Sequence, residues 1–182
     1  MTLTKTAYWA VALTLFTAAC QQPKESKETE SEEVEAKESG PIRMPEYDYS
    51  DSVRMGTHKL VYSLHREADD SLAMVKDEIG DTYVDNFYML SVVCDGQKVF
   101  EKRFTKENFA SRLEEDFKKN GILDGFRFIE AKDGKAIFGA CVSYPESDML
   151  SPFIVTVDIS SGTSTIDKDN VLDVEESDSD EG

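Results

Sequence analysis

The chain has 182 residues, of which 37 are acidic and 20 are basic, so that its formal net charge is −17. A chain this negative repels phosphate backbones, and we therefore expect no nucleic-acid partner. Anionic lipid headgroups would repel it too, so any attachment to a membrane has to come from an apolar group. The length predicts one folded domain.

The first twenty residues have the pattern of a secretory signal. Lys5 precedes an apolar run over residues 7–16, and small residues at 17–19 lead to Cys20. The apolar run is about half the roughly twenty residues that a membrane-spanning helix needs. A cysteine directly after the small residues resembles the lipobox of bacterial lipoproteins.

That resemblance implies cleavage before Cys20 and acylation of its thiol, which becomes the point of attachment to the bilayer. Stable anchoring takes more than one acyl chain, such as the diacylglyceryl and palmitate groups of the class. Gln21 stands where Asp would favour retention in the inner membrane, so the resemblance implies the outer membrane, facing either the periplasm or the outside. Two alternatives stay open: ordinary signal cleavage, because Thr17 replaces the usual Leu and Thr17–Ala19 fits an A-x-A-like site, or an uncleaved anchor.

Charge and composition divide the chain into four parts. We expect a signal peptide at 1–19, an acidic disordered tether at 20–50, a single domain at 51–166 and an acidic disordered tail at 167–182. Residues 21–50 and 167–182 carry many acids and few apolar groups, and such segments cannot bury enough surface to offset the entropy of ordering.

Apolar alternation predicts strands through most of the domain. The expected strands are 58–66, 86–94, 97–104, 125–131, 135–144, 153–159 and 163–167. Asp95-Gly96 and Asp133-Gly134 predict two hairpins. In the first hairpin we favour a three-residue bulged loop that sets Leu90 opposite Phe100. In the second, a two-residue loop sets Ile129 opposite Phe138 and Ala131 opposite Ala136.

One helix is expected at 106–120, with Thr105 as its N-cap and Gly121 as its stop. Phe109, Leu113 and Phe117 recur every four residues on one face. Residues 67–85 contain a weak helical spacing, but their many acids favour an exposed loop. The elements together predict an α+β fold: an antiparallel sheet of about six to seven strands with one amphipathic helix packed on it. The alternative is a small curled β-barrel with a helix.

No residue pattern indicates a catalytic centre, and we expect no cofactor. His58 and His65 lie seven apart on one strand, too far apart to share a metal ion. Cys94 and Cys141 are candidates for a disulfide, since the expected compartment permits one, or for two separate buried thiols. A weak calcium candidate is the acid cluster Asp77, Glu78, Asp81 and Asp85; the acid run at 167–175 is weaker still.

Four tyrosines are candidates for an aromatic ligand surface, against the commoner role of packing: Tyr47, Tyr49, Tyr83 and Tyr88.

The segments HKLVYSLHREADDSLAMVKDEIGDTYVDNFYMLSV, KRFTKENFASRLEEDFKKNGILDGF and ACVSYPESDMLSPFIVTVD resemble uncharacterised lipoproteins of the Bacteroides type that are grouped as a domain of unknown function. The resemblance spans roughly residues 53–160 and implies no activity. We therefore expect a lipid-anchored envelope protein without enzymatic activity that binds an unknown protein or small molecule. The alternatives are an envelope hydrolase that uses carboxylates, and an assembly partner that pairs through a sheet edge.

Overall fold

The computed structural model describes residues 40–169. The expected signal, Cys20, most of the expected tether and most of the expected tail lie outside the described residues. Within residues 40–169, no helix has both the length and the apolar character that a bilayer crossing requires.

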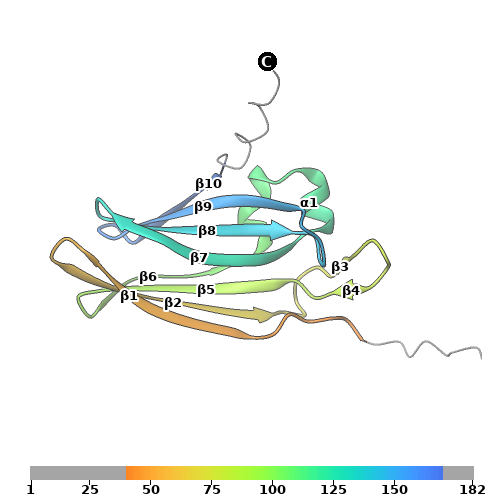
Figure 1. Ribbon diagram of the computed structural model, residues 1–182, viewed down its shortest axis with the longest axis horizontal. Coiled ribbons are helices and arrows are strands. Elements are labelled where there is room, and N and C mark those ends of the chain that lie inside the picture. Colours follow the sequence, from red (N-terminus) through yellow and green to blue (C-terminus); the bar gives the residue numbers. More distant parts are fainter. Residues whose placement is uncertain (1–39, 170–182) are drawn as a thin grey trace, which may run out of the picture. The chain divides into compact units, whose positions relative to one another are not determined.

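Two four-stranded antiparallel sheets lie face to face (Figure 1). The first sheet has the order β1 (Tyr47–Met55), β2 (His58–Ala68), β5 (Asn86–Cys94) and β6 (Gln97–Phe104). The second has the order β10 (Thr163–Lys168), β9 (Leu150–Asp158), β8 (Lys135–Ser143) and β7 (Ile122–Lys132). A small third sheet pairs β3 (Val75–Lys76) with β4 (Thr82–Tyr83).

The predicted antiparallel hairpins are confirmed, but the prediction of one sheet covered by a helix is wrong. Strands hold 59% of the described residues and helices only 10%, and the sheets do not close into a barrel. The physical reason is the distribution of apolar side chains, because each sheet has one apolar face and the two faces bury each other.

The core lies between the two sheets. Tyr62 of β2 stacks on Phe128 of β7 with 4.5 Å between ring centroids, and Phe138 of β8 meets the edge of Tyr62 at 5.8 Å. The largest fully buried side chains come from both sheets and from the segment that joins them; they include Leu60, Leu64, Leu90, Phe104, Phe109, Phe138 and Phe153. Each such side chain contributes about 1.5–3 kcal/mol by its removal from water.

Ordered structure begins before residue 51, where the domain was expected to start. Residues 47–55 form β1, whose residues pair with β2 from Tyr47↔Arg66 to Met55↔His58. Upstream, the Ile42 N–H donates to the Thr82 carbonyl at 2.7 Å and the Val84 N–H donates to the Ile42 carbonyl at 2.9 Å. Most side chains of β1 are exposed, so cross-strand pairing is its main support, and Val53 and Met55 add packing against the core.

Both Asp-Gly hairpins form, with a register that differs in part from the expected one. Asp95-Gly96 is a two-residue turn and the bulge lies inside β6, so that Phe100 pairs with Val92 and Leu90 faces Lys102. The second hairpin has the expected pair Ala131↔Ala136, but a bulge in β7 places Phe128 opposite Phe138. Both bulges lie on edge strands, where a bulge disrupts pairing with further chains.

The expected helix 106–120 is broken into a 3₁₀ helix, η1 (Lys106–Arg112), and a short α-helix, α1 (Glu115–Asn120). The Lys106 ammonium group donates to the Gly121 carbonyl at 2.6 Å. An uninterrupted helix would place these residues about 22 Å apart, at 1.5 Å per residue. The chain therefore has to bend between them, and it is extended at Leu113 and Glu114.

Lys106 also meets the buried carboxylate of Asp85. The two charged groups are 3.6 Å apart, and their side chains are 6% and 3% exposed. One Asp85 oxygen accepts the N–H groups of Asn86 and Leu123, both at 2.8 Å. This cluster joins the start of β5, η1 and the start of β7.

Replacing Lys106 by Met should lower the free energy of unfolding at pH 7 by about 3–5 kcal/mol, because it leaves the Asp85 charge buried and unpaired. Burial already raises the pKa of Asp85, against the opposing effects of Lys106 and its hydrogen bonds. When folding raises the pKa of a carboxyl group, the folded state is more stable at low pH, where the group is protonated, than at high pH, where it is charged. The deficit of K106M should therefore shrink as the pH falls toward 4. Urea unfolding at pH 7 and at pH 4.5 measures it; a deficit that is equal at both pH values contradicts the assignment.

Gly162 in the β9–β10 turn tests the contact between the two sheets. Its φ is +66°, and a Cβ there would lie 2.6 Å from the Val99 carbonyl oxygen of β6. Gly134 is the matched control, with φ +75° and nothing within 4 Å of an added Cβ. G134A should cost about 1–2 kcal/mol for left-handed backbone alone, and G162A should cost clearly more in the same thermal unfolding experiment. Equal costs would show that the sheets do not constrain this turn.

Candidate functional site

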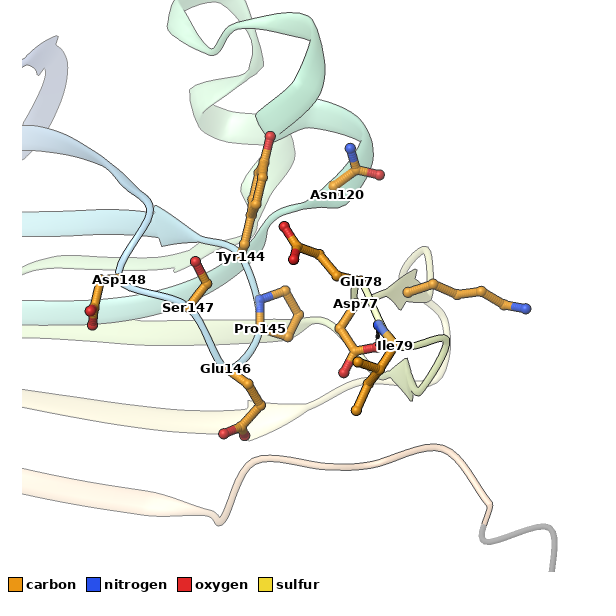
Figure 2. Close-up of a pocket in the computed structure, with 10 residues that line it drawn as sticks. Asp77, Glu78, Ile79, Asn120, Tyr144, Pro145, Glu146, Ser147 and Asp148 are labelled. Carbon is orange, nitrogen blue, oxygen red and sulfur yellow. Dashed lines mark hydrogen bonds between the residues drawn. The ribbon is translucent and has the colours of Figure 1, made fainter. Parts of the chain in front are cut away.

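A pocket with a volume of about 640 Å³ lies at one end of the sandwich (Figure 2). Three segments build it: the β3–β4 turn with Lys76–Ile79, the end of α1 at Asn120, and the β8–β9 loop at 144–148. Its volume is in the range of small-molecule sites.

Local hydrogen bonds fix the two loops. One oxygen of Asp77 accepts the N–H groups of Ile79, Gly80 and Asp81 at 2.8–3.1 Å. Gly80 takes a φ of +98° that this turn needs. On the other side, the Tyr144 N–H donates to the Met149 carbonyl at 3.0 Å, and the Tyr144 ring lies 4.8 Å from that of Phe117.

The pocket is negatively charged. Asp77, Glu78, Glu146 and Asp148 line it, with Lys76 as the one cation in its lining. Burial raises the pKa of the Tyr83 hydroxyl group, and the negative charges of Glu146, Asp77 and Asp81 raise it further. Tyr144, Pro145 and Ile79 add apolar surface. This combination favours a ligand that carries positive charge and an apolar part.

The calcium candidate is not assembled. One carboxylate oxygen of Asp77 accepts backbone hydrogen bonds from its own turn, while Asp85 is buried and forms an ion pair with Lys106. In the described part of the chain, the groups close enough to share a metal ion are two other sets, and none of Asp77, Glu78, Asp81 and Asp85 belongs to them. The acids follow one another along the sequence, but among the described residues no three of them come within reach of one metal ion.

Cys94 and Cys141 are free thiols in this structure. Cys94 ends β5 in the first sheet, and Cys141 lies on β8 in the second. A Cβ at Gly125 would lie 2.5 Å from the Cys141 sulfur, so the glycine makes room for it. Burial raises the pKa of Cys141 to about 11, and burial also raises that of Cys94. Both stay protonated near neutral pH and are therefore poor nucleophiles.

The structure separates the four tyrosines. Tyr47 and Tyr49 on β1 are stacked with 6.3 Å between centroids and are 42% and 41% exposed. Tyr83 and Tyr88 are buried, and the Tyr88 hydroxyl donates to the Asp124 carbonyl at 2.6 Å. Tyr49 continues inward to Tyr62 at 6.1 Å. The two exposed rings therefore extend the aromatic core to the edge of the first sheet.

The β8–β9 loop was not identified from the sequence as part of a site, and no motif in it would have indicated one. β1 was missed too, although the alternation of Tyr47, Tyr49, Asp51, Val53 and Met55 is a usable signal for a strand. Cys20 lies outside the described residues, so its acylation stays a prediction.

A protein-family model of a domain of unknown function, DUF4738, matches residues 25–165. No curated protein matches the chain. Because the matched residues make up more than half of the sequence, the chain belongs to the DUF4738 family.

Proposed function

We propose that this protein is a lipid-anchored component of the bacterial cell envelope that binds a small cationic ligand and performs no catalysis. The observation that carries the binding role is the pocket of about 640 Å³ lined by four carboxylates and one ammonium group. The anchor rests on the sequence around Cys20.

Binding is favoured over hydrolysis by the state of the acids. Carboxylate catalysis of glycoside cleavage requires one acid whose surroundings keep it protonated. Glu78, Glu146 and Asp148 are exposed at the pocket. Asp85 is the one buried acid among residues 40–169. Its carboxylate forms an ion pair with Lys106 and accepts hydrogen bonds from two backbone N–H groups.

The anchor is tested by Cys20→Ala. If the Cys20 thiol carries the lipid, wild-type protein sediments with the membrane fraction and C20A moves to the soluble fraction. Mass spectrometry of the N-terminal peptide then shows an acylated cysteine in the wild type. A C20A protein that stays in the membrane pellet, or an unmodified Cys20 at the mature N-terminus, would refute the lipid anchor.

The pocket is tested with spermine as a probe cation, by calorimetric titration of the full-length chain. Glu78→Gln and Asp148→Asn should each weaken binding about fivefold, because a unit charge at 4 Å in water contributes about 1 kcal/mol. Glu130→Gln is the control, since it removes one exposed negative charge from the far end of the β7–β8 hairpin. An equal loss in all three variants would mean that spermine senses only the net charge.

A second candidate function is assembly through the edge of β1, favoured by one observation. Met55 and His58 flank a two-residue turn, so the N–H groups of the even-numbered residues of β1 point away from β2. The Ser52 N–H, for instance, turns to the Asp51 carboxylate at 2.6 Å. The open edge and the exposed Tyr47–Tyr49 pair suit strand addition by a partner.

Ser50→Pro tests this second function, because it removes an outward N–H and should leave the bonds to β2 in place. If a partner adds a strand here, a protein that co-purifies with the wild type should be lost from S50P, while circular dichroism stays unchanged. Undiminished co-purification with S50P would exclude β1 as the docking edge.

A further inference from the structure

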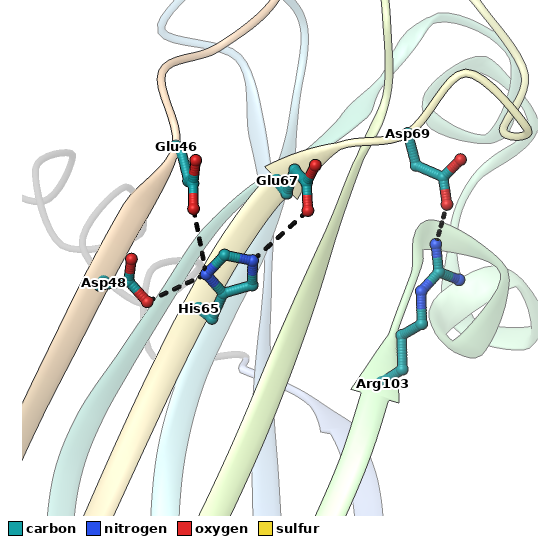
Figure 3. A network of polar contacts seen from close by, with 6 residues as sticks. All are labelled: Glu46, Asp48, His65, Glu67, Asp69 and Arg103. Atoms are coloured by element: carbon teal, nitrogen blue, oxygen red, sulfur yellow. Dashed lines mark hydrogen bonds and ion pairs between the residues drawn. The ribbon is translucent and has the colours of Figure 1, made fainter.

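A histidine with three carboxylates lies on the outer face of the first sheet (Figure 3), and none of the four residues lines the pocket. The His65 Nδ1 atom is 3.0 Å from Asp48 Oδ1 and 3.9 Å from Glu46 Oε1. Its other nitrogen, Nε2, is 3.5 Å from Glu67 Oε2. β1 supplies Asp48, the residue before β1 is Glu46, and β2 supplies His65 and Glu67.

We propose that His65, Asp48 and Glu46 bind one divalent transition-metal ion of the zinc class, with Glu67 as the carboxylate that orients the imidazole ring. Ligand atoms about 2.0–2.2 Å from a tetrahedral zinc ion lie about 3.4 Å from one another. The two distances from Nδ1 bracket that value, and one ligand atom from each of the three residues lies within 4.8 Å of the others.

The two imidazole nitrogens of His65 have different carboxylate partners, and this supports the proposed metal site. A histidine that binds a metal through one nitrogen usually donates its other N–H to a carboxylate, which fixes the tautomer and the ring. Glu67 is placed for that role on Nε2, while Nδ1 faces the two ligand carboxylates. The Phe87 ring, 5.8 Å from the imidazole, packs beside it and limits its rotation.

The cluster has an excess of negative charge. Within residues 40–169, the ion pairs of Glu46, Asp48 and Glu67 are all with His65 and none is with a lysine or arginine. The Arg103 guanidinium group, drawn beside the cluster in Figure 3, stacks on Phe87 and pairs with Asp69 instead. With the neutral imidazole that metal binding requires, the cluster has a formal charge of −3, and a divalent cation reduces it to −1.

The chain contains a second set with a histidine, and it is a poorer site. His58 Nδ1 lies 2.6 Å from Asp95 Oδ2, with Cys94 nearby. Asp95 already accepts the Lys59 N–H on its other oxygen. No carboxylate flanks the second nitrogen of His58 among the described ion pairs. Because burial and the Asp95 charge raise the pKa of Cys94, its thiol resists the deprotonation that metal binding needs.

The experiment is a titration of the full-length chain with zinc chloride at pH 7.5, followed by calorimetry. We expect one zinc ion per chain. His65→Gln should weaken binding at least 100-fold, and Glu67→Gln should weaken it 10–100-fold, as for other carboxylates behind a metal-bound histidine. His58→Gln should change it less than twofold.

A matched pair of variants separates ligation from general charge. Asp48→Asn and Asp51→Asn each remove one negative charge from β1, but Asp51 points to the opposite face of the sheet. D48N should weaken zinc binding at least tenfold and D51N less than twofold. Circular dichroism checks that each variant keeps its strands.

Nuclear magnetic resonance of the imidazole nitrogens gives an independent readout, because the chain has only two histidines. Zinc should shift the Nδ1 resonance of His65 and leave that of His58 in place. The proposal is overturned if zinc binds H65Q as tightly as the wild type, if the His58 signal moves instead, or if calcium chloride binds with the same affinity. The last result would mean that only the acidic surface is sensed.

Discussion

The buried contact of Lys106 with Asp85 and with the Gly121 carbonyl is the constraint on which the rest of the structure depends. Residues 105–121 carry the chain from the last strand of one sheet to the first strand of the other. A single cation reaches across that crossing and holds its beginning and end together. This is why a segment with good helical periodicity folds as two short pieces, and why Phe109 reaches the core between the sheets. The cost of burying two charges is offset only because hydrogen bonds occupy the carboxylate and the ammonium group.

The connection between the two sheets, residues 105–121, also helps to form the pocket. Because α1 ends at Asn120, just before β7 starts, the end of the sandwich gathers α1, the β3–β4 turn and the β8–β9 loop around one pocket. The other polar set, around His65, depends instead on β1 being paired with β2. The two sets therefore rest on different parts of the fold, and a substitution in one should leave the other intact. A protein with this arrangement presents one acidic pocket in its loops and one histidine–carboxylate cluster on a flat strand face.

Edge strands show how the fold limits unwanted pairing. β6 and β7 carry bulges, and Lys102 of β6 lies over the Phe104 ring at 4.8 Å, a charged side chain on an edge strand. β1 pairs with β2 without a bulge over nine residues. Charged side chains limit the pairing of this edge with other chains, and the Asp51 carboxylate accepts a hydrogen bond from the Ser52 N–H group. The two stacked tyrosines on the same strand make it the least covered edge of the first sheet.

The sequence by itself determined most of the strands, although not β1, β3 and β4, because period-two alternation and Asp-Gly turns depend only on neighbouring residues. β5 and β6 have the predicted bounds, and β9 is the inner strand that its apolar run indicated. Only the tertiary structure decided that the hairpins divide into two sheets, that the helix breaks, and that bulges shift both registers. Those outcomes depend on Lys106 meeting Gly121 and on the two apolar faces packing together, contacts between residues far apart in the chain. The same holds for the sites: the pocket and the His65 cluster join side chains from separate elements, whereas the acids that are close in sequence at 77–85 do not come together as a metal site.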